Sequence, residues 1–245
     1  MEAYTNSDQE FLLNLAIKAS LQAGEYIVSN RPAMITTKSH AYDLVTEHDQ
    51  AAEIIIREIL SESKIDILGE ELGGIRKYDL TWVIDPIDGT NNFVTGSPMV
   101  GVNIALFVIG EPILAVTYLP FLKELYTCIK GKGVSFNGVL LSDLPKVPAP
   151  YVPVVLTNSD PLSKSKYPSR LIGAASVELA WCARGIFAAV AYEGVQPWDV
   201  APGILFIREL GGTAKVRGSF GNVFESGVII GNRHTVEELY STIEN

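Results

Sequence analysis

The sequence predicts a mixed α+β protein, because segments with the hydrophobic spacing of helices stand beside segments typical of strands. The first 60 residues contain two stretches in which apolar side chains recur every three or four positions, as in amphipathic helices. Residues 100–129 contain apolar runs separated by Gly-containing turn signals, as in antiparallel strands. With 245 residues, 47% of them hydrophobic, the chain can bury a substantial core as one large domain or two small lobes.

The charge balance bears on partners and compartment. A formal net charge of −9 disfavours nucleic acid as a partner and argues against membrane attachment. No apolar run reaches the roughly 18 residues of a membrane-spanning helix, and the residues after Met1 lack the pattern of a signal peptide. We therefore expect a cytoplasmic protein. Cys128 and Cys182 form no C-x-x-C pair and are expected to be reduced and structural.

The first predicted helix begins at a capping box that Ser7 and Glu10 form. Its apolar positions recur at helical spacing as Leu12, Leu15, Ala16, Ala19, Ala23, Tyr26 and Ile27. The helix is expected to end before Pro32, and Lys38 follows in a polar connector.

The second predicted helix lies within 43–60, and Thr46 can cap it. Asp49 precedes Ala52 by three residues and Ile56 by seven, so its carboxylate is expected on the buried face of the helix. A buried charge needs a partner. Thr46 and Asp49 also fit a variant of the capping box, which leaves a purely structural interpretation open.

The segment 82–93 joins an apolar strand to two carboxylates and a glycine turn. Thr81 to Ile84 predicts a short strand, and Pro86, which has no N–H for a ladder, is expected to end it just after Asp85. Proline also restricts the residue before it, so the spacing from Asp85 to Asp88 is fixed and the two carboxylates can converge on one point.

Gly89 and Thr90 follow these carboxylates and would begin a short helix, where backbone N–H groups bind anions. Aspartates alone would repel a phosphate, so a hard cation such as Mg²⁺ is expected to bridge the two. The combination predicts metal-assisted phosphoryl transfer. The alternative is a plain turn, because Asp-Pro followed by Asp-Gly is ordinary turn chemistry.

A strand at Ile65 to Leu68 is expected to present Glu70 and Glu71 at its tip. Adjacent side chains of an extended chain point in opposite directions, so only one of these glutamates can face the metals. After the segment 82–93, runs at 100–108 and 113–118 predict a hairpin, which residues 124–129 continue.

Four prolines within 142–153 mark the predicted linker. It divides the chain into an N-terminal lobe, 1–145, and a C-terminal lobe, 146–245. The second lobe is expected to contain a strand at 152–156, a helix ending near 185, strands at 211–217 and 226–231, and a last helix near 235–243.

Asp199 is expected to open another helix in this lobe, with Pro202 in the first turn and Gly211 and Gly212 at its end. Taken alone, Asp199 would most simply be an N-cap. The small residues Gly173, Ala174 and Ala175 would let a ligand approach the backbone, although taken alone they fit ordinary close helix packing.

The chain resembles the inositol monophosphatase superfamily of magnesium-dependent, lithium-sensitive phosphatases. Four motifs of that family occur here in the family's order: D-L-V-T-x-x-D at 43–49, G-E-E at 69–71, W-x-I-D-P-I-D-G-T-x-N-F at 82–93, and W-D-x-A-x-G at 198–203. The resemblance covers nearly the whole chain. It implies an α+β fold layered as an αβαβα sandwich, and hydrolysis of a small sugar or inositol phosphate.

The resemblance also implies roles for individual residues. Two or three Mg²⁺ ions per active site would be held by Glu70, Asp85, Asp88, Asp199 and the carbonyl of Ile87. Asp49 and Thr90 would be catalytic together with Glu70, by activating a water that attacks phosphorus without a covalent phosphoenzyme. The substrate would bind to Gly89, Thr90, Gly173, Ala174, Ala175, Glu193 and Asp199, and Lys38 matches a further lysine of the family.

One position departs from the family. The family has a glutamate seven residues before the aspartate of the W-D segment, where it binds substrate hydroxyls. Here Tyr192 is seven residues before Asp199 and Glu193 is six, so Glu193 is retained as a candidate substrate ligand. Asn91 replaces the commonest residue of the signature, at a position where the family varies.

Inositol monophosphate is the favoured substrate, because the chain is as compact as the simplest family members. Relatives act on fructose 1,6-bisphosphate, 3′-phosphoadenosine 5′-phosphate or histidinol phosphate, which stay as alternatives. Haloacid-dehalogenase-type phosphatases use a D-x-D-G-T motif with an aspartyl nucleophile, whereas here the two aspartates are three residues apart. A non-catalytic ligand-binding member would be a third class. Family members are commonly homodimers, which we expect here.

Overall fold

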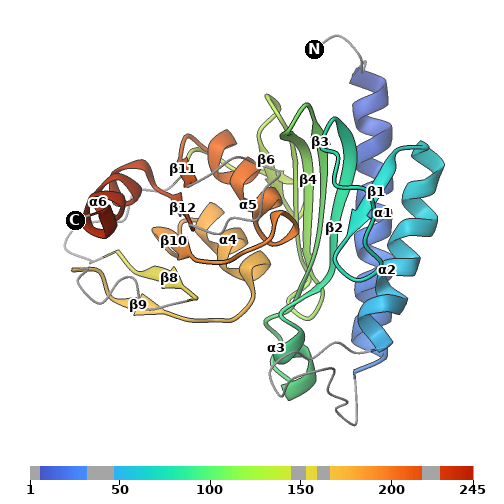
Figure 1. The fold of residues 1–245 in the computed structure, drawn as a ribbon, viewed down its shortest axis with the longest axis horizontal. Helices are drawn as coiled ribbons and strands as arrows, with labels where there is room; N and C mark the ends of the chain where they lie inside the picture. The colour runs from blue at the N-terminus through green and yellow to red at the C-terminus, as the bar shows by residue number, and fades with distance from the viewer. Residues whose placement is uncertain (1–5, 32–46, 145–152, 159–165, 217–226, 245) are drawn as a thin grey trace.

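We describe the protein from a computed structural model, in which residues 6–31, 47–144, 153–158, 166–216 and 227–244 are described (Figure 1). Lys38, Asp43 and Thr46 lie outside these ranges. The predicted boundary between 145 and 146 lies outside them as well, so the division into two lobes stays a prediction.

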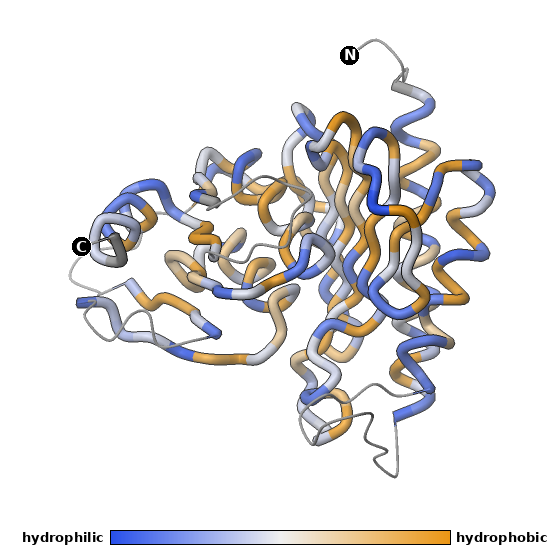
Figure 2. Tube along the Cα trace, in the orientation of Figure 1, coloured by the Kyte–Doolittle hydropathy of each residue, from blue (hydrophilic) through white to orange (hydrophobic). Residues whose placement is uncertain are grey.

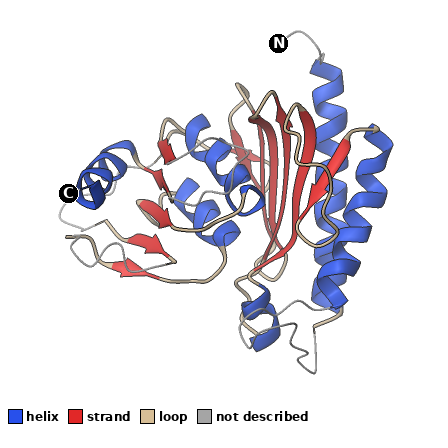
Figure 3. Ribbon diagram, viewed as in Figure 1, coloured by secondary structure: helices blue, strands red, loops and turns tan. Residues whose placement is uncertain are grey.

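Two helices cover one face of the larger sheet (Figures 1 and 3). They are α1 (Asn6–Ser29) and α2 (Glu47–Leu60). Their apolar stripes meet the sheet in one buried cluster, in which Ala23 and Ile56 pack with Trp82. The amphipathic pattern of the N-terminal helix is thus confirmed, and that of the second helix is confirmed from Glu47 onward.

The larger sheet has seven strands in chain order among the described residues. They are β1 (Asp66–Gly69), β2 (Leu80–Asp88), β3 (Gly101–Val108), β4 (Glu111–Leu119), β5 (Glu124–Ile129), β6 (Val134–Phe136) and β7 (Val139–Leu140). β1 pairs with β2 in parallel, and the following pairs are antiparallel. The predicted hairpin is β3 and β4, and its turn passes through Ile109 and Gly110, both with positive φ. Apolar residues run along these strands in Figure 2.

The prediction that Pro86 ends the strand after Asp85 is wrong, because β2 continues to Asp88. Asp85 pairs with Asn103 of β3 and Asp88 pairs with Gly101, so β2 holds one residue more than its partner between these pairs. A bulge is a position where a strand tolerates a proline, since the ladder is already interrupted there. Asp85 is therefore inside the strand, beside the bulge.

Two helices lie between the larger sheet and a second sheet. They are α4 (Ala175–Ala183) and α5 (Pro197–Glu209). The second sheet has the order β11-β12-β10-β8-β9, with β8 (Val155–Thr157), β9 (Ser169–Arg170), β10 (Ala189–Tyr192), β11 (Thr213–Val216) and β12 (Val228–Gly231). The last helix, α6 (Arg233–Glu244), packs on its far face. The order helices, sheet, helices, sheet, helix confirms the predicted α+β sandwich (Figure 1).

The start of α5 differs from the prediction. The helix begins at Pro197 and not at Asp199, and Pro202 lies inside it, beyond the first turn. Proline is favoured at the first helical position, so Pro197 begins the helix two residues earlier than expected. Pro202 consequently occupies a position where a helix needs an N–H group.

None of the described helices is both long enough and apolar enough to cross a membrane.

Candidate metal centre and active site

Three carboxylates from separate elements meet at the end of β1 and β2. Glu70, Asp85 and Asp199 each offer an oxygen within 4.8 Å of the oxygens of the other two. Glu70 follows β1, Asp85 lies in β2 and Asp199 lies in the first turn of α5. β1 and β2 belong to the larger sheet. α5 covers the face of this sheet that α2 does not cover. The sheet and α5 must therefore both be folded before the three carboxylates come together.

Backbone hydrogen bonds hold each of these residues. The Glu70 N–H donates to the carbonyl of Ile84 at 3.2 Å, which extends the pairing of β1 with β2 by one residue. The Ile87 N–H donates to Oδ1 of Asp85 at 3.1 Å, across the bulge. The Gln196 N–H donates to Oδ2 of Asp199 at 2.8 Å, which caps α5.

The fourth predicted metal aspartate, Asp88, is held by α4. Its Oδ2 accepts a hydrogen bond from the Ser176 N–H at 2.5 Å and another from the Ser176 hydroxyl. Asp88 is not one of the three convergent carboxylates, although its negative charge raises the pKa of Asp199. Ser176, buried to 2% exposure, was missed by sequence reasoning, because nothing in the sequence relates it to a residue 88 positions away.

The carboxyl groups are protonated more readily than isolated ones. Glu70 is exposed, yet partial desolvation by neighbouring protein atoms, followed by the negative charges of Asp199 and Glu71, raises its pKa to about 8. Burial and the charge of Asp88 raise the pKa of Asp199 to about 7. Burial foremost, and then Glu70, raises the pKa of Asp85 well above its usual value. Each negative charge opposes the others.

This donor set fits a hard divalent cation. Carboxylate and carbonyl oxygens are the ligands that Mg²⁺ prefers, and a cation would offset the repulsion among the acidic groups. The carbonyl oxygen of Ile87, the predicted backbone ligand, lies 3.1 Å from Thr90 Oγ1.

Thr90 and Asp49 are in contact. Thr90 Oγ1 lies 3.0 Å from Oδ1 of Asp49, whose side chain is 2% exposed. Asp49 therefore lies on the buried face of α2, as its spacing indicated, and the Thr90 hydroxyl is one of its partners.

Gly89 and the segment 173–175 lie against each other. Gly89 has φ of +86° and begins α3 (Thr90–Thr95). A Cβ atom at Gly89 would lie 2.9 Å from Cβ of Ala174 and 2.9 Å from the carbonyl oxygen of Met99. The two predicted substrate-binding segments are therefore packed directly against each other, and only a glycine fits at position 89.

Glu178 organises the segment 172–174 and was also missed. Its Oε1 accepts hydrogen bonds from the N–H of Ile172 at 2.8 Å and of Gly173 at 3.2 Å, and its Oε2 accepts one from the Tyr192 hydroxyl. Glu178 is 1% exposed, so these donors compensate its burial.

Glu193, the candidate substrate ligand, is not one of the three convergent carboxylates. It follows β10, is exposed, and exchanges two hydrogen bonds with Asn158 through its backbone. Tyr192, the residue at the family's spacing, is buried against Glu178.

Glu53 holds the loop that carries Glu70. Its fully buried carboxylate accepts hydrogen bonds from the N–H of Glu71 at 2.8 Å and of Leu72 at 3.2 Å, and from Nε of Arg57 at 2.7 Å. A signal for Glu53 exists in the sequence, since it follows Asp49 by one helical turn on the same buried face of α2.

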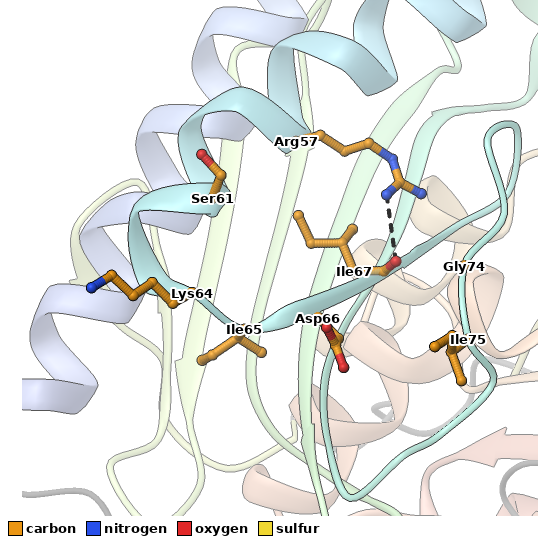
Figure 4. Close-up of a pocket in the computed structure, with 8 residues that line it drawn as sticks. All are labelled: Arg57, Ser61, Lys64, Ile65, Asp66, Ile67, Gly74 and Ile75. Atoms are coloured by element: carbon orange, nitrogen blue, oxygen red, sulfur yellow. Dashed lines mark hydrogen bonds between the residues drawn. The ribbon is translucent and has the colours of Figure 1, made fainter.

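A cavity of about 420 Å³ lies behind this loop (Figure 4). It is lined by Arg57, Ser61, Lys64, Ile65, Asp66, Ile67, Gly74 and Ile75. Arg57 donates across it to the carbonyl of Ile67 at 3.4 Å. Glu70, Asp85 and Asp199 do not line this cavity, which is separate from the acidic group.

Comparison with known proteins relates this geometry to one family. The chain is 34% identical over 222 residues to the Nus factor SuhB of Pasteurella multocida, covering 82% of this chain and 83% of that protein. It is 36% identical over 196 residues to the inositol-1-monophosphatase of Caulobacter vibrioides, covering 72% of this chain and 77% of that protein. A solved inositol monophosphatase of Thermotoga maritima matches with a TM-score of 0.83 and 26% identity, over 95% of this chain and 96% of that one. The model of the inositol monophosphatase family matches residues 8–245, and the chain belongs to this family.

Proposed function

We propose that the protein is a Mg²⁺-dependent phosphomonoesterase that hydrolyses inositol monophosphate. The observation that carries this proposal is the convergence of Glu70, Asp85 and Asp199 next to a Thr90–Asp49 hydrogen bond. Family membership and the name of the Caulobacter relative support the reaction class.

In this proposal, Glu70, Asp85, Asp88, Asp199 and the Ile87 carbonyl hold the metal. When bound, Mg²⁺ supplies positive charge that lowers the pKa of water and stabilises the developing charge on the phosphate and on the leaving oxygen. Protein residues supply the remaining interactions. Asp49 accepts from the Thr90 hydroxyl, and this leaves the Thr90 oxygen as an acceptor that orients a water for attack on phosphorus.

The substrate phosphate would approach Gly89 and Thr90 at the start of α3. The inositol ring would lie against Gly173, Ala174 and Ala175, where the backbone is close to Gly89. Glu193, exposed at the end of β10, would contact substrate hydroxyls. Lys38, outside the described residues, stays a further candidate.

The test is release of inorganic phosphate from inositol 1-phosphate, with Mg²⁺ present or removed by a chelator. Fructose 1,6-bisphosphate, 3′-phosphoadenosine 5′-phosphate and histidinol phosphate are assayed beside it. We expect Mg²⁺-dependent release that is fastest with inositol 1-phosphate. Faster release from another of the four compounds would keep the reaction and change the substrate.

Two outcomes would favour other reaction classes. Trapping of an aspartyl-phosphate would indicate a covalent mechanism of the haloacid-dehalogenase type. Binding of a divalent cation without phosphate release from any of the four compounds would indicate a ligand-binding protein.

Partners and compartment complete the proposal. We infer a cytoplasmic homodimer with a small phosphorylated substrate. We also infer that neither nucleic acid nor a membrane is a partner, because the net charge of −9 disfavours both. Light scattering on the purified protein tests the dimer, and a salt-dependent RNA shift would contradict the expectation about nucleic acid.

A further inference from the structure

Asn103 lies between the backbone segments that carry two of the convergent carboxylates. It is in β3, directly paired with Asp85 of β2, and only 1% of it is exposed. Its side-chain Nδ2 donates to two carbonyl groups in the first turn of α5, that of Trp198 at 3.3 Å and that of Asp199 at 3.2 Å. One buried amide therefore connects β3, the strand paired with the one that carries Asp85, to the helix that carries Asp199.

The sequence of α5 explains why this amide is needed. In an α-helix the carbonyl of residue i accepts from the N–H of residue i+4, so the Trp198 carbonyl would accept from residue 202. That residue is Pro202, which has no N–H and whose ring crowds the same carbonyl. A buried carbonyl without a donor is costly, and Asn103 provides the donor that the helix itself lacks.

The orientation of the Asn103 amide is fixed by its surroundings. Backbone carbonyls only accept, so the nitrogen side must face α5. The oxygen side then faces Thr117 of β4, whose hydroxyl donates to Oδ1 at 2.7 Å, and Thr117 is likewise 1% exposed. The Asn103 side chain lies buried between β3, β4 and α5. Its amide therefore depends on these protein groups for its hydrogen bonds.

We propose that Asn103 is a positioning residue that replaces the missing N–H of Pro202 and thereby sets Asp199 opposite Asp85 for cation binding. The inference rests on the proposed metal site, and it concerns how the chain builds that site. Residues that hold a metal ligand in place without touching the metal typically contribute to affinity, and removing one weakens metal binding by about 10-fold to 100-fold.

The decisive experiment is a double-mutant cycle in Mn²⁺ affinity, measured by calorimetry on the whole metal-free protein without substrate. Asn103→Leu removes the donor at similar volume and is expected to weaken Mn²⁺ binding about 10-fold or more. Pro202→Ala restores an N–H to α5 and is expected to change affinity by less than about 3-fold. In the Pro202→Ala background, Asn103→Leu should cost several-fold less, because the helix then supplies its own donor to Trp198.

Thr81→Val is the matched control. Thr81 is a buried residue of the same sheet whose hydroxyl donates to the backbone carbonyl of Lys77 and not to a carbonyl of α5. Thr81→Val and Asn103→Leu should both lower the unfolding temperature. Thr81→Val should leave Mn²⁺ affinity unchanged. If Asn103→Leu does not fold, Thr117→Val takes its place, because it removes the group that orients Asn103, and we expect a loss of about 2-fold to 10-fold.

Unchanged Mn²⁺ affinity in these variants, or an equal loss with and without Pro202→Ala, would overturn the inference. A wild-type protein that binds no Mn²⁺ would overturn it together with the metal site. A third result is that the Mn²⁺ affinities follow the predicted double-mutant cycle while no substrate releases phosphate. That result would support the positioning role of Asn103 and reject only the proposed reaction.

Discussion

The hydroxyl oxygen of Thr90 lies 3.0 Å from the Asp49 carboxylate, although 41 positions separate the two residues. We expect Thr90→Val to lower kcat about 100-fold or more, because it removes the hydroxyl that is proposed to orient the water. Thr90→Ser keeps the hydroxyl and should retain most activity. Phosphate release at saturating Mg²⁺ measures both, and similar rates for the two variants would reject the role of Thr90.

Asp88→Asn tests the metal assignment without disturbing the fold. The amide oxygen of Asn can still accept from Ser176, so the free energy of unfolding should fall by less than about 1 kcal/mol. Turnover should be abolished, because the position loses its negative charge. The exposed Asp66 provides a control as Asp66→Asn. Full activity in Asp88→Asn would refute the site assignment.

Gly89→Ala should be more damaging than the same change at Gly110. Both glycines have positive φ, which strains any other residue by about 1–3 kcal/mol. At Gly110 a Cβ atom would meet nothing within 4 Å, whereas at Gly89 it would meet Ala174 and the Met99 carbonyl at 2.9 Å. The crowding adds about 1–3 kcal/mol to the loss at Gly89, and urea denaturation of the two variants measures the difference. Equal losses would contradict the close packing.

Glu53→Gln should loosen the loop that carries Glu70. Gln offers one acceptor oxygen, whereas the Glu53 carboxylate serves Arg57, Glu71 and Leu72. We expect the free energy of unfolding to fall by about 1–3 kcal/mol, together with weaker Mg²⁺ binding. Glu58→Gln, on the exposed side of the same helix, should change neither quantity. A stability loss without an effect on Mg²⁺ binding would limit Glu53 to a structural role.

The stability of the metal-free protein should fall as pH rises. The pKa is raised from 4.5 to about 8 at Glu70 and from 3.8 to about 7 at Asp199. Between these values the folded protein binds more protons than the unfolded chain, so rising pH favours unfolding. Thermal unfolding in a chelator should therefore show a lower midpoint near pH 8 than near pH 5.5, and added Mg²⁺ should reverse the trend. A midpoint that rises over this range would contradict the raised pKa values.

The sequence predicted the helices and strands that a local pattern determines. The spacing of apolar residues predicted α1, and the glycine turn signal predicted the hairpin of β3 and β4. β5 was predicted with its observed bounds. The course of β2 was not predictable in this way, because Pro86 ends a regular strand and only the pairing with β3 shows the bulge that accommodates it. The start of α5 was also predicted wrongly. Both Pro197 and Pro202 fit the first turn of a helix, and the helix begins at Pro197.

Within the candidate site, the acidic residues were named from the sequence, and their metal-binding role stays a prediction. The supporting residues were not found, because each acts across the fold. Ser176 bonds Asp88, Glu178 bonds the backbone before Ala174, and Asn103 bonds α5. Such contacts depend on how sheets and helices stack, which a hydrophobic pattern alone does not determine.

The distance along the chain between these partners has a consequence for biosynthesis. Asp88 and Ser176 are 88 positions apart, and Asn103 and Trp198 are 95 apart. A ribosome adds about 5–20 residues per second, so the first half of the chain is synthesised roughly 5–20 s before the helices that complete the acidic group. During that interval the nascent polypeptide exposes the sheet face that α4 and α5 later cover, and this face is where a chaperone would bind.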